Sequence, residues 1–139
     1  MNHMKKVICI CGSMQFLDQM QQLKLELERL GYAVHLPEAE ESENCYAALP
    51  AAAKPAMKRN FIDAHLRKIR ESDAVLIANY SKHGTAGYIG PNTLIEMAFA
   101  YAMQKQIFLL QPMAEQPCKD EVDGLAATVI NDDLSEIAL

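Results

Sequence analysis

The chain has 139 residues, half of them hydrophobic, which is enough for the core of one domain spanning residues 1–139. Its net charge of −5 argues against a broad nucleic-acid-binding surface. The apolar runs are far shorter than the roughly 20 residues of a membrane span, and the N-terminus lacks the pattern of a cleaved signal peptide. These features predict a cytoplasmic protein that binds neither membranes nor nucleic acid.

Apolar strands alternate with amphipathic helices along the chain. A strand at Lys5–Cys11 is followed by a helix whose apolar residues recur every three or four positions from Phe16 to Leu30. Residues 37–56 are acidic and interrupted by prolines, which predicts either a flap over a site or a plain surface loop. The remaining predicted elements are strands at Tyr32–Leu36, Ala74–Ala78, Ile107–Leu110 and Ala126–Ile130, helices at Met57–Glu71, Thr93–Gln104 and Asp132–Leu139, and loops at 79–92 and 113–123.

This alternation predicts an α/β fold with an open parallel sheet and helices on both of its faces. We expect a three-layer sandwich around a five-stranded parallel sheet in the order 2-1-3-4-5. Ligands of such sheets bind at the carboxyl ends of the strands, where the strand order reverses. Here that point lies between the first and third strands, where Cys11–Met14 meets Asn79–Glu96. Met14 and Asn79 are therefore candidate substrate-binding residues.

Glu96 is the strongest candidate for chemistry. It lies near the start of a helix that is otherwise apolar on nearly every side, and burying an unpaired carboxylate is costly. A structural alternative exists, because Thr93 and Glu96 match the capping box S/T-x-x-E, in which the glutamate only accepts a backbone N–H. Both interpretations place Glu96 beside the predicted ligand site.

Three further groups of residues near this site are candidates for binding or proton transfer. Gly12 and Ser13 follow a strand and precede a helix, a place that favours an anion, although Ser13 can also act only as a helix N-cap. His65 lies on a helix among apolar neighbours, so it is either a packed residue or the group best suited to exchange protons near neutral pH. Lys58 and Arg59 form a solvated face or help to attract a phosphate.

The four cysteines do not predict a metal site. Cys9, Cys11, Cys45 and Cys118 contain no CxxC pair and no zinc-finger spacing. Cys9 and Cys11 lie in an apolar strand, which indicates buried structural thiols, with a redox role as the alternative. The sequence predicts neither a metal nor a cofactor.

Three motifs together resemble the nucleoside 2-deoxyribosyltransferase-like superfamily, which includes the 2'-deoxynucleoside 5'-phosphate N-hydrolases. They are Cys-Gly-Ser-Met at 11–14, Ser-Asp-Ala-Val-Leu at 72–76, and Gly-Pro-Asn-Thr-Leu-Ile-Glu-Met-Ala-Phe-Ala at 90–100. The resemblance implies a flavodoxin-like, Rossmann-like α/β fold. It also implies cleavage of an N-glycosidic bond, with Glu96 at the position of a glutamate that attacks the anomeric carbon. It also implies that Gly12, Ser13, Gly90 and Asn92 hold the sugar or its 5'-phosphate.

One departure from the superfamily concerns the leaving base. Where the superfamily carries an aspartate that helps the base to leave, this sequence has His65. Either His65 takes the role of proton donor, or the chemistry is weakened or lost. The sequence therefore supports two functions: cleavage or transfer at the N-glycosidic bond of a nucleoside or nucleotide, or binding of a nucleotide without turnover. An FMN-binding flavodoxin is a third, weaker alternative.

The apolar helix over residues 93–104 and the habit of the superfamily predict a homo-oligomer, a dimer or larger. The same helix would also be apolar if it were buried within one subunit.

Overall fold

The computed structural model describes residues 4–37 and 46–139. A five-stranded sheet lies at its centre, with every neighbouring pair of strands parallel and in the order β2-β1-β3-β4-β5. The predicted fold class and strand order are therefore confirmed. The strands are β1 (Val7–Cys11), β2 (Ala33–His35), β3 (Ala74–Ile77), β4 (Gln106–Leu109) and β5 (Thr128–Val129).

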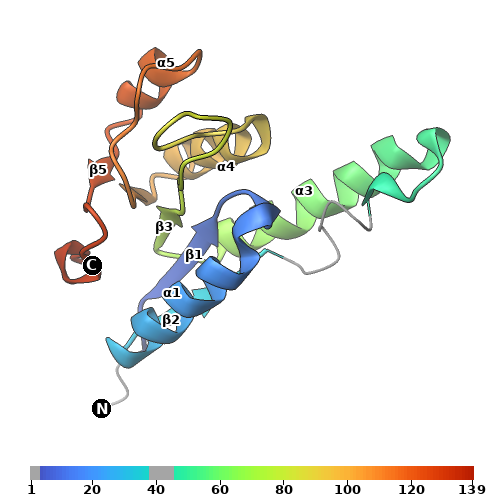
Figure 1. Cartoon of the computed structure of the whole chain (residues 1–139). Coiled ribbons are helices and arrows are strands. Elements are labelled where there is room, and N and C mark those ends of the chain that lie inside the picture. Colours follow the sequence, from blue (N-terminus) through green and yellow to red (C-terminus); the bar gives the residue numbers. More distant parts are fainter. Residues whose placement is uncertain (1–3, 38–45) are drawn as a thin grey trace.

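In the described residues, α-helices and short 3-10 turns flank and connect these strands (Figure 1). The α-helices are α1 (Leu17–Arg29), α3 (Lys54–Arg70), α4 (Pro91–Ala102) and α5 (Lys119–Asp123). The 3-10 turns are η1 (Met14–Phe16), η3 (Ala51–Ala53) and η4 (Leu134–Glu136). Among the described helices, none is both long and apolar enough to cross a lipid bilayer.

Alternation along the strands divides the core into two halves. Even-numbered strand residues such as Ile8, Ile10 and Leu76 pack with α1 and the C-terminal turn. Odd-numbered residues such as Cys9 and Val75 pack on the opposite face, with α3, α4 and α5. Successive side chains of a strand point to opposite faces, so helices on both sides make the sheet the middle of three layers.

Some predicted elements differ from the structure. Residues 113–123 were predicted as a loop, but their second half forms α5, which an ion pair between Lys119 and Asp123 spans. The C-terminal helix is only the 3-10 turn η4. Helix α3 begins three residues before its predicted start, because Pro55 is tolerated in a first turn, where the backbone N–H groups lack helical partners. Residues 38–45 of the predicted loop 37–56 lie outside the described residues.

Candidate active site

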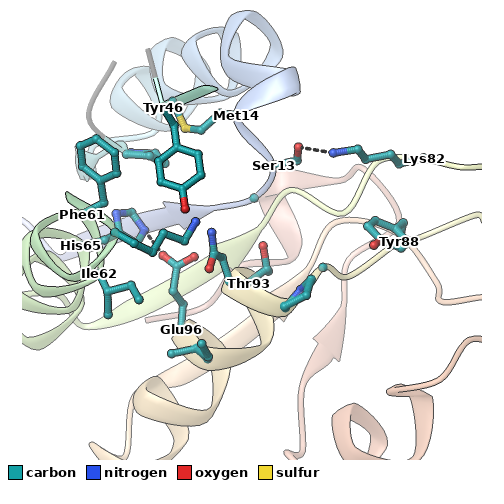
Figure 2. Close-up of a pocket in the computed structure, with 17 residues that line it drawn as sticks. Ser13, Met14, Tyr46, Phe61, Ile62, His65, Lys82, Tyr88, Thr93 and Glu96 are labelled. Atoms are coloured by element: carbon teal, nitrogen blue, oxygen red, sulfur yellow. Dashed lines mark hydrogen bonds and ion pairs between the residues drawn. The ribbon is translucent and has the colours of Figure 1, made fainter. Parts of the chain in front are cut away.

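A cavity of about 360 Å³ opens at the carboxyl ends of β1 and β3, where the strand order reverses. Its walls come from the loop after β1, from α3, from the loop after β3 and from the N-terminal turns of α4 (Figure 2). The volume is within the range of small-molecule sites. Seven of the eight predicted site residues line it, namely Gly12, Ser13, Met14, His65, Gly90, Asn92 and Glu96.

Glu96 and His65 point toward each other across the cavity wall (Figure 2). The distance between His65 Nε2 and Glu96 Oε2 is 2.7 Å, and the two side chains are 3% and 14% exposed. The imidazole thus holds one carboxylate oxygen, while the carboxyl group stays in contact with the cavity. His65 Nδ1 is buried and has no hydrogen-bond partner among the described residues.

The predicted capping box does not form. Helix α4 has Gly90 as its N-cap and Pro91 in its first turn, so Thr93 is already inside the helix. Proline is favoured at the first helical position, and this moves the start of the helix two residues upstream of the predicted one. Glu96 consequently lies in the second turn, where its carboxylate binds His65 instead of a backbone N–H.

The loop after β1 supplies the polar end of the cavity. Ser13 is the N-cap of η1 and accepts a hydrogen bond from the backbone of Gln15, so the capping interpretation is confirmed. Its hydroxyl oxygen also accepts a hydrogen bond from Lys82 Nζ at 2.9 Å. Gly12 packs closely on β3, because a Cβ there would lie 3.1 Å from the carbonyl oxygen of Ala78.

Asn79 is the one predicted site residue that does not line the cavity. Its side chain is 2% exposed and exchanges two hydrogen bonds with the backbone of Gln111. The position at the end of β3 was correctly identified as close to the site, but the amide instead ties the loop after β3 to the loop after β4.

Several residues of the cavity were not singled out from the sequence. Lys82, Tyr88 and Tyr46 line it, together with Phe61 and Ile62 of α3. For Lys82, the available signal was its position in the glycine-rich loop at the switch point. The aromatic and aliphatic residues carried no such signal, because apolar residues on a helix are equally typical of a core. Lys58 also lines the cavity, so it is not only part of a solvated helix face.

A cluster of two thiols and an imidazole lies beneath the cavity. Cys9 and Cys11 are fully buried, as predicted, and Cys9 Sγ lies 3.7 Å from His65 Nε2. A hydrogen bond from Cys11 and the proximity of His65 hold the pKa of the Cys9 thiol below its usual range, against the effect of burial. The sequence did not suggest this cluster, because His65 lies more than fifty residues from the two cysteines along the chain.

Comparison with known proteins identifies the fold. No protein-family model and no curated protein sequence matches the chain. Solved structures do: a CMP N-glycosidase from Clostridium botulinum, BcmB, is 21% identical with a TM-score of 0.54, covering 89% of this chain and 85% of its own. A 2-deoxyribosyltransferase from Bacillus psychrosaccharolyticus is 16% identical with a TM-score of 0.56, covering 80% and 76%.

A third similar structure is the 2-deoxyribosyltransferase from Leishmania mexicana, at 16% identity and a TM-score of 0.51, covering 84% of this chain and 70% of that one. The chain thus has the fold of the nucleoside 2-deoxyribosyltransferase-like proteins. The resemblance inferred from the three motifs is confirmed at the level of the fold.

Proposed function

We propose that this protein cleaves or transfers at the N-glycosidic bond of a nucleoside or nucleotide, with Glu96 as the nucleophile. The observation that carries the proposal is the Glu96 carboxylate in the wall of the cavity, with one oxygen held 2.7 Å from His65 Nε2. A carboxylate held in this way is oriented for attack and stabilises the positive charge that develops on a sugar ring. The shared fold supports the same class of chemistry.

The reaction has two displacements. A Glu96 oxygen bonds to the anomeric carbon while the bond from that carbon to the base nitrogen breaks, and the base takes the electron pair and a proton. Water then attacks the same carbon and releases Glu96, which is hydrolysis. If a second base attacks instead, the sugar is transferred. The measurement of products decides between hydrolysis and transfer.

His65 acts first of all on Glu96. Its Nε2 is directed at the carboxylate, so it fixes the direction from which Glu96 approaches the sugar. With His65 as an imidazolium, its Nε2 proton passes to the departing base nitrogen and a neutral imidazole protonated on Nδ1 remains. In this way His65 serves as the acid in place of the superfamily's aspartate.

A 5'-phosphate fits the opposite end of the cavity. Ser13 lies at the start of η1, and Lys82 approaches the same hydroxyl, so a hydroxyl and a cation converge there. Lys58 adds a second basic side chain to the lining, whereas Glu96 is the sole acidic residue among the lining residues described. This balance favours an anionic substrate, and we infer a nucleoside 5'-monophosphate.

The experiment is a base-release assay on deoxynucleosides, ribonucleosides and their 5'-monophosphates, with chromatography of the free base. We expect release from at least one 5'-monophosphate and slower release from the matching nucleoside. No release from any member of the panel, with or without an acceptor base, would refute the proposed activity.

A second candidate is nucleotide binding without turnover. It is favoured by the absence of a second carboxylate from the described lining of the cavity, since Asp63 is exposed and lies elsewhere on α3. Under this alternative the same monophosphates raise the melting temperature, no base is released, and Glu96→Gln leaves the stabilisation unchanged.

A further inference from the structure

The cluster beneath the cavity has the composition of a metal site. Cys9 and Cys11 are alternate residues of β1, so both side chains point to the face that α3 covers. Helix α3 brings His65 onto that face, and a ligand atom of each of the three residues lies within 4.8 Å of the others. Their exposed fractions are 0%, 0% and 3%.

We propose that Cys9, Cys11 and His65 bind one thiophilic divalent cation of the zinc class. Sulfur and imidazole nitrogen are the ligands that such ions prefer. Tetrahedral bonds of about 2.3 Å to sulfur and about 2.05 Å to nitrogen separate a sulfur from a nitrogen by about 3.6 Å. The observed distance from Cys9 Sγ to His65 Nε2 is 3.7 Å, so these two ligands already have the required spacing.

Cys11 needs only a small movement to complete the set. Two sulfur ligands of a tetrahedral ion lie about 3.8 Å apart, against an upper limit of 4.8 Å in the structure. Rotation of one side chain covers that difference. An ordinary disulfide is not a competing outcome, because Cα atoms of alternate residues in an extended strand are about 6.6–6.8 Å apart, at the far end of the range that a disulfide spans.

Charge balance favours a dipositive ion at this depth. Two thiolates and one neutral imidazole cancel two positive charges, so the loaded cluster is neutral and its burial costs little. The route from solvent is the cavity, which His65 lines and which begins at Gly12, the residue after Cys11. A fourth ligand, water or an atom of a bound molecule, can reach the ion by the same route.

Metal binding at this site involves the proposed nucleophile. The ion would occupy Nε2, the same nitrogen that binds Glu96. Because Nδ1 has no partner in the described part of the chain, the ring can turn from the carboxylate toward the sulfurs without breaking another hydrogen bond. Occupation of the site therefore releases Glu96 from His65, and the metal acts as a regulator of the cavity above it.

Binding is tested with Co²⁺, a spectroscopic probe of zinc sites, on metal-free protein under reducing conditions. We expect a thiolate-to-cobalt charge-transfer band that saturates at one ion per chain and disappears when Zn²⁺ is added. Cys9→Ser and Cys11→Ser should each weaken binding at least tenfold. The double variant Cys45→Ser/Cys118→Ser, which keeps only the two β1 thiols, should bind like the parent protein.

X-ray absorption of the zinc-loaded parent protein identifies the atoms bound to the ion. This measurement does not depend on whether the variants fold. Two sulfur ligands and at least one nitrogen ligand support the site. No saturable band, a band that survives both β1 substitutions, or a first shell of oxygen and nitrogen alone would overturn it. None of these measurements uses turnover, so their failure is distinguishable from failure of the proposed glycosidase activity.

Discussion

Replacing Glu96 by glutamine separates the chemistry of this side chain from its packing. The amide has the same size, and its oxygen can still accept a hydrogen bond from His65 Nε2, which lies 2.7 Å from Glu96 Oε2. It has no negative charge and is a poor nucleophile toward a sugar carbon. The substitution therefore removes the proposed reaction while the walls of the cavity are kept.

The expected effects on stability and on rate differ in size. A hydrogen bond to a charged group contributes about 1.5–3 kcal/mol and a neutral one about 0.5–1.5 kcal/mol, so Glu96→Gln should lower the free energy of unfolding by about 1 kcal/mol. For a chain of this length that shifts Tm by about 3–4 °C. Loss of the nucleophile should lower kcat by at least about 10³-fold, or about 4 kcal/mol in activation free energy.

The assay compares base release and thermal unfolding of the parent protein and the variant. Glu71→Gln, an exposed carboxylate at the C-terminus of α3, serves as the matched control and should retain full activity. If Glu96→Gln releases base within tenfold of the parent rate, Glu96 is not the nucleophile and the reasoning from its position is refuted.

Other substitutions test the rest of the structure. Lys82→Ala should lower kcat/KM for a 5'-monophosphate by about 10- to 100-fold, the value of a charged hydrogen bond, and leave the matching nucleoside unaffected; an equal loss for both substrates would exclude a phosphate contact. Gly87→Ala should cost about 3 kcal/mol or more, because φ is +63° and the new Cβ would lie 2.1 Å from the carbonyl oxygen of Pro112. Gly84→Ala, with φ at +72° and nothing within 4 Å, should cost only about 1–2 kcal/mol, and equal Tm losses would contradict this difference. Tyr101 on α4 is 54% exposed, and Tyr101→Asp should shift an oligomer toward monomer in sedimentation; a parent protein that sediments as a monomer would contradict the predicted assembly.

The fold could be predicted because its signals are local and repeated. Apolar strands alternating with helices imply crossover connections, and these restrict a parallel sheet to few strand orders. Element boundaries were less predictable. Thr93 and Glu96 match a capping box, which predicts that the helix begins near Thr93. The helix instead begins at Pro91, with Gly90 as its N-cap, because proline is favoured at the first helical position. Helix α5 was missed because five residues carry too little periodicity to detect.

Contacts between distant segments were the part that sequence patterns could not supply. Glu96 and His65 were each singled out, but their 2.7 Å contact depends on how α3 and α4 pack. Asn79 was expected to bind a ligand because it ends a strand at the switch point, and it instead pairs with the backbone of Gln111. A polar residue at the end of a strand has many possible hydrogen-bond partners. Which of them it binds depends on the position of the neighbouring loop.

The order of groups along the cavity limits the substrate more strongly than any single residue does. Ser13 and Lys82 lie at one end and Phe61 of α3 at the other, with Glu96 between them and nearer to α3 (Figure 2). Under the proposed function, a nucleotide would lie along this line in one direction, with its phosphate at Lys82, its anomeric carbon at Glu96 and its base at the wall formed by α3. In this orientation the base would depart toward His65, which contacts Glu96 from α3. A substrate whose cleavage requires its 5'-phosphate should therefore also require His65. The reason is that a single bound orientation would place the phosphate at Lys82 and the base at His65.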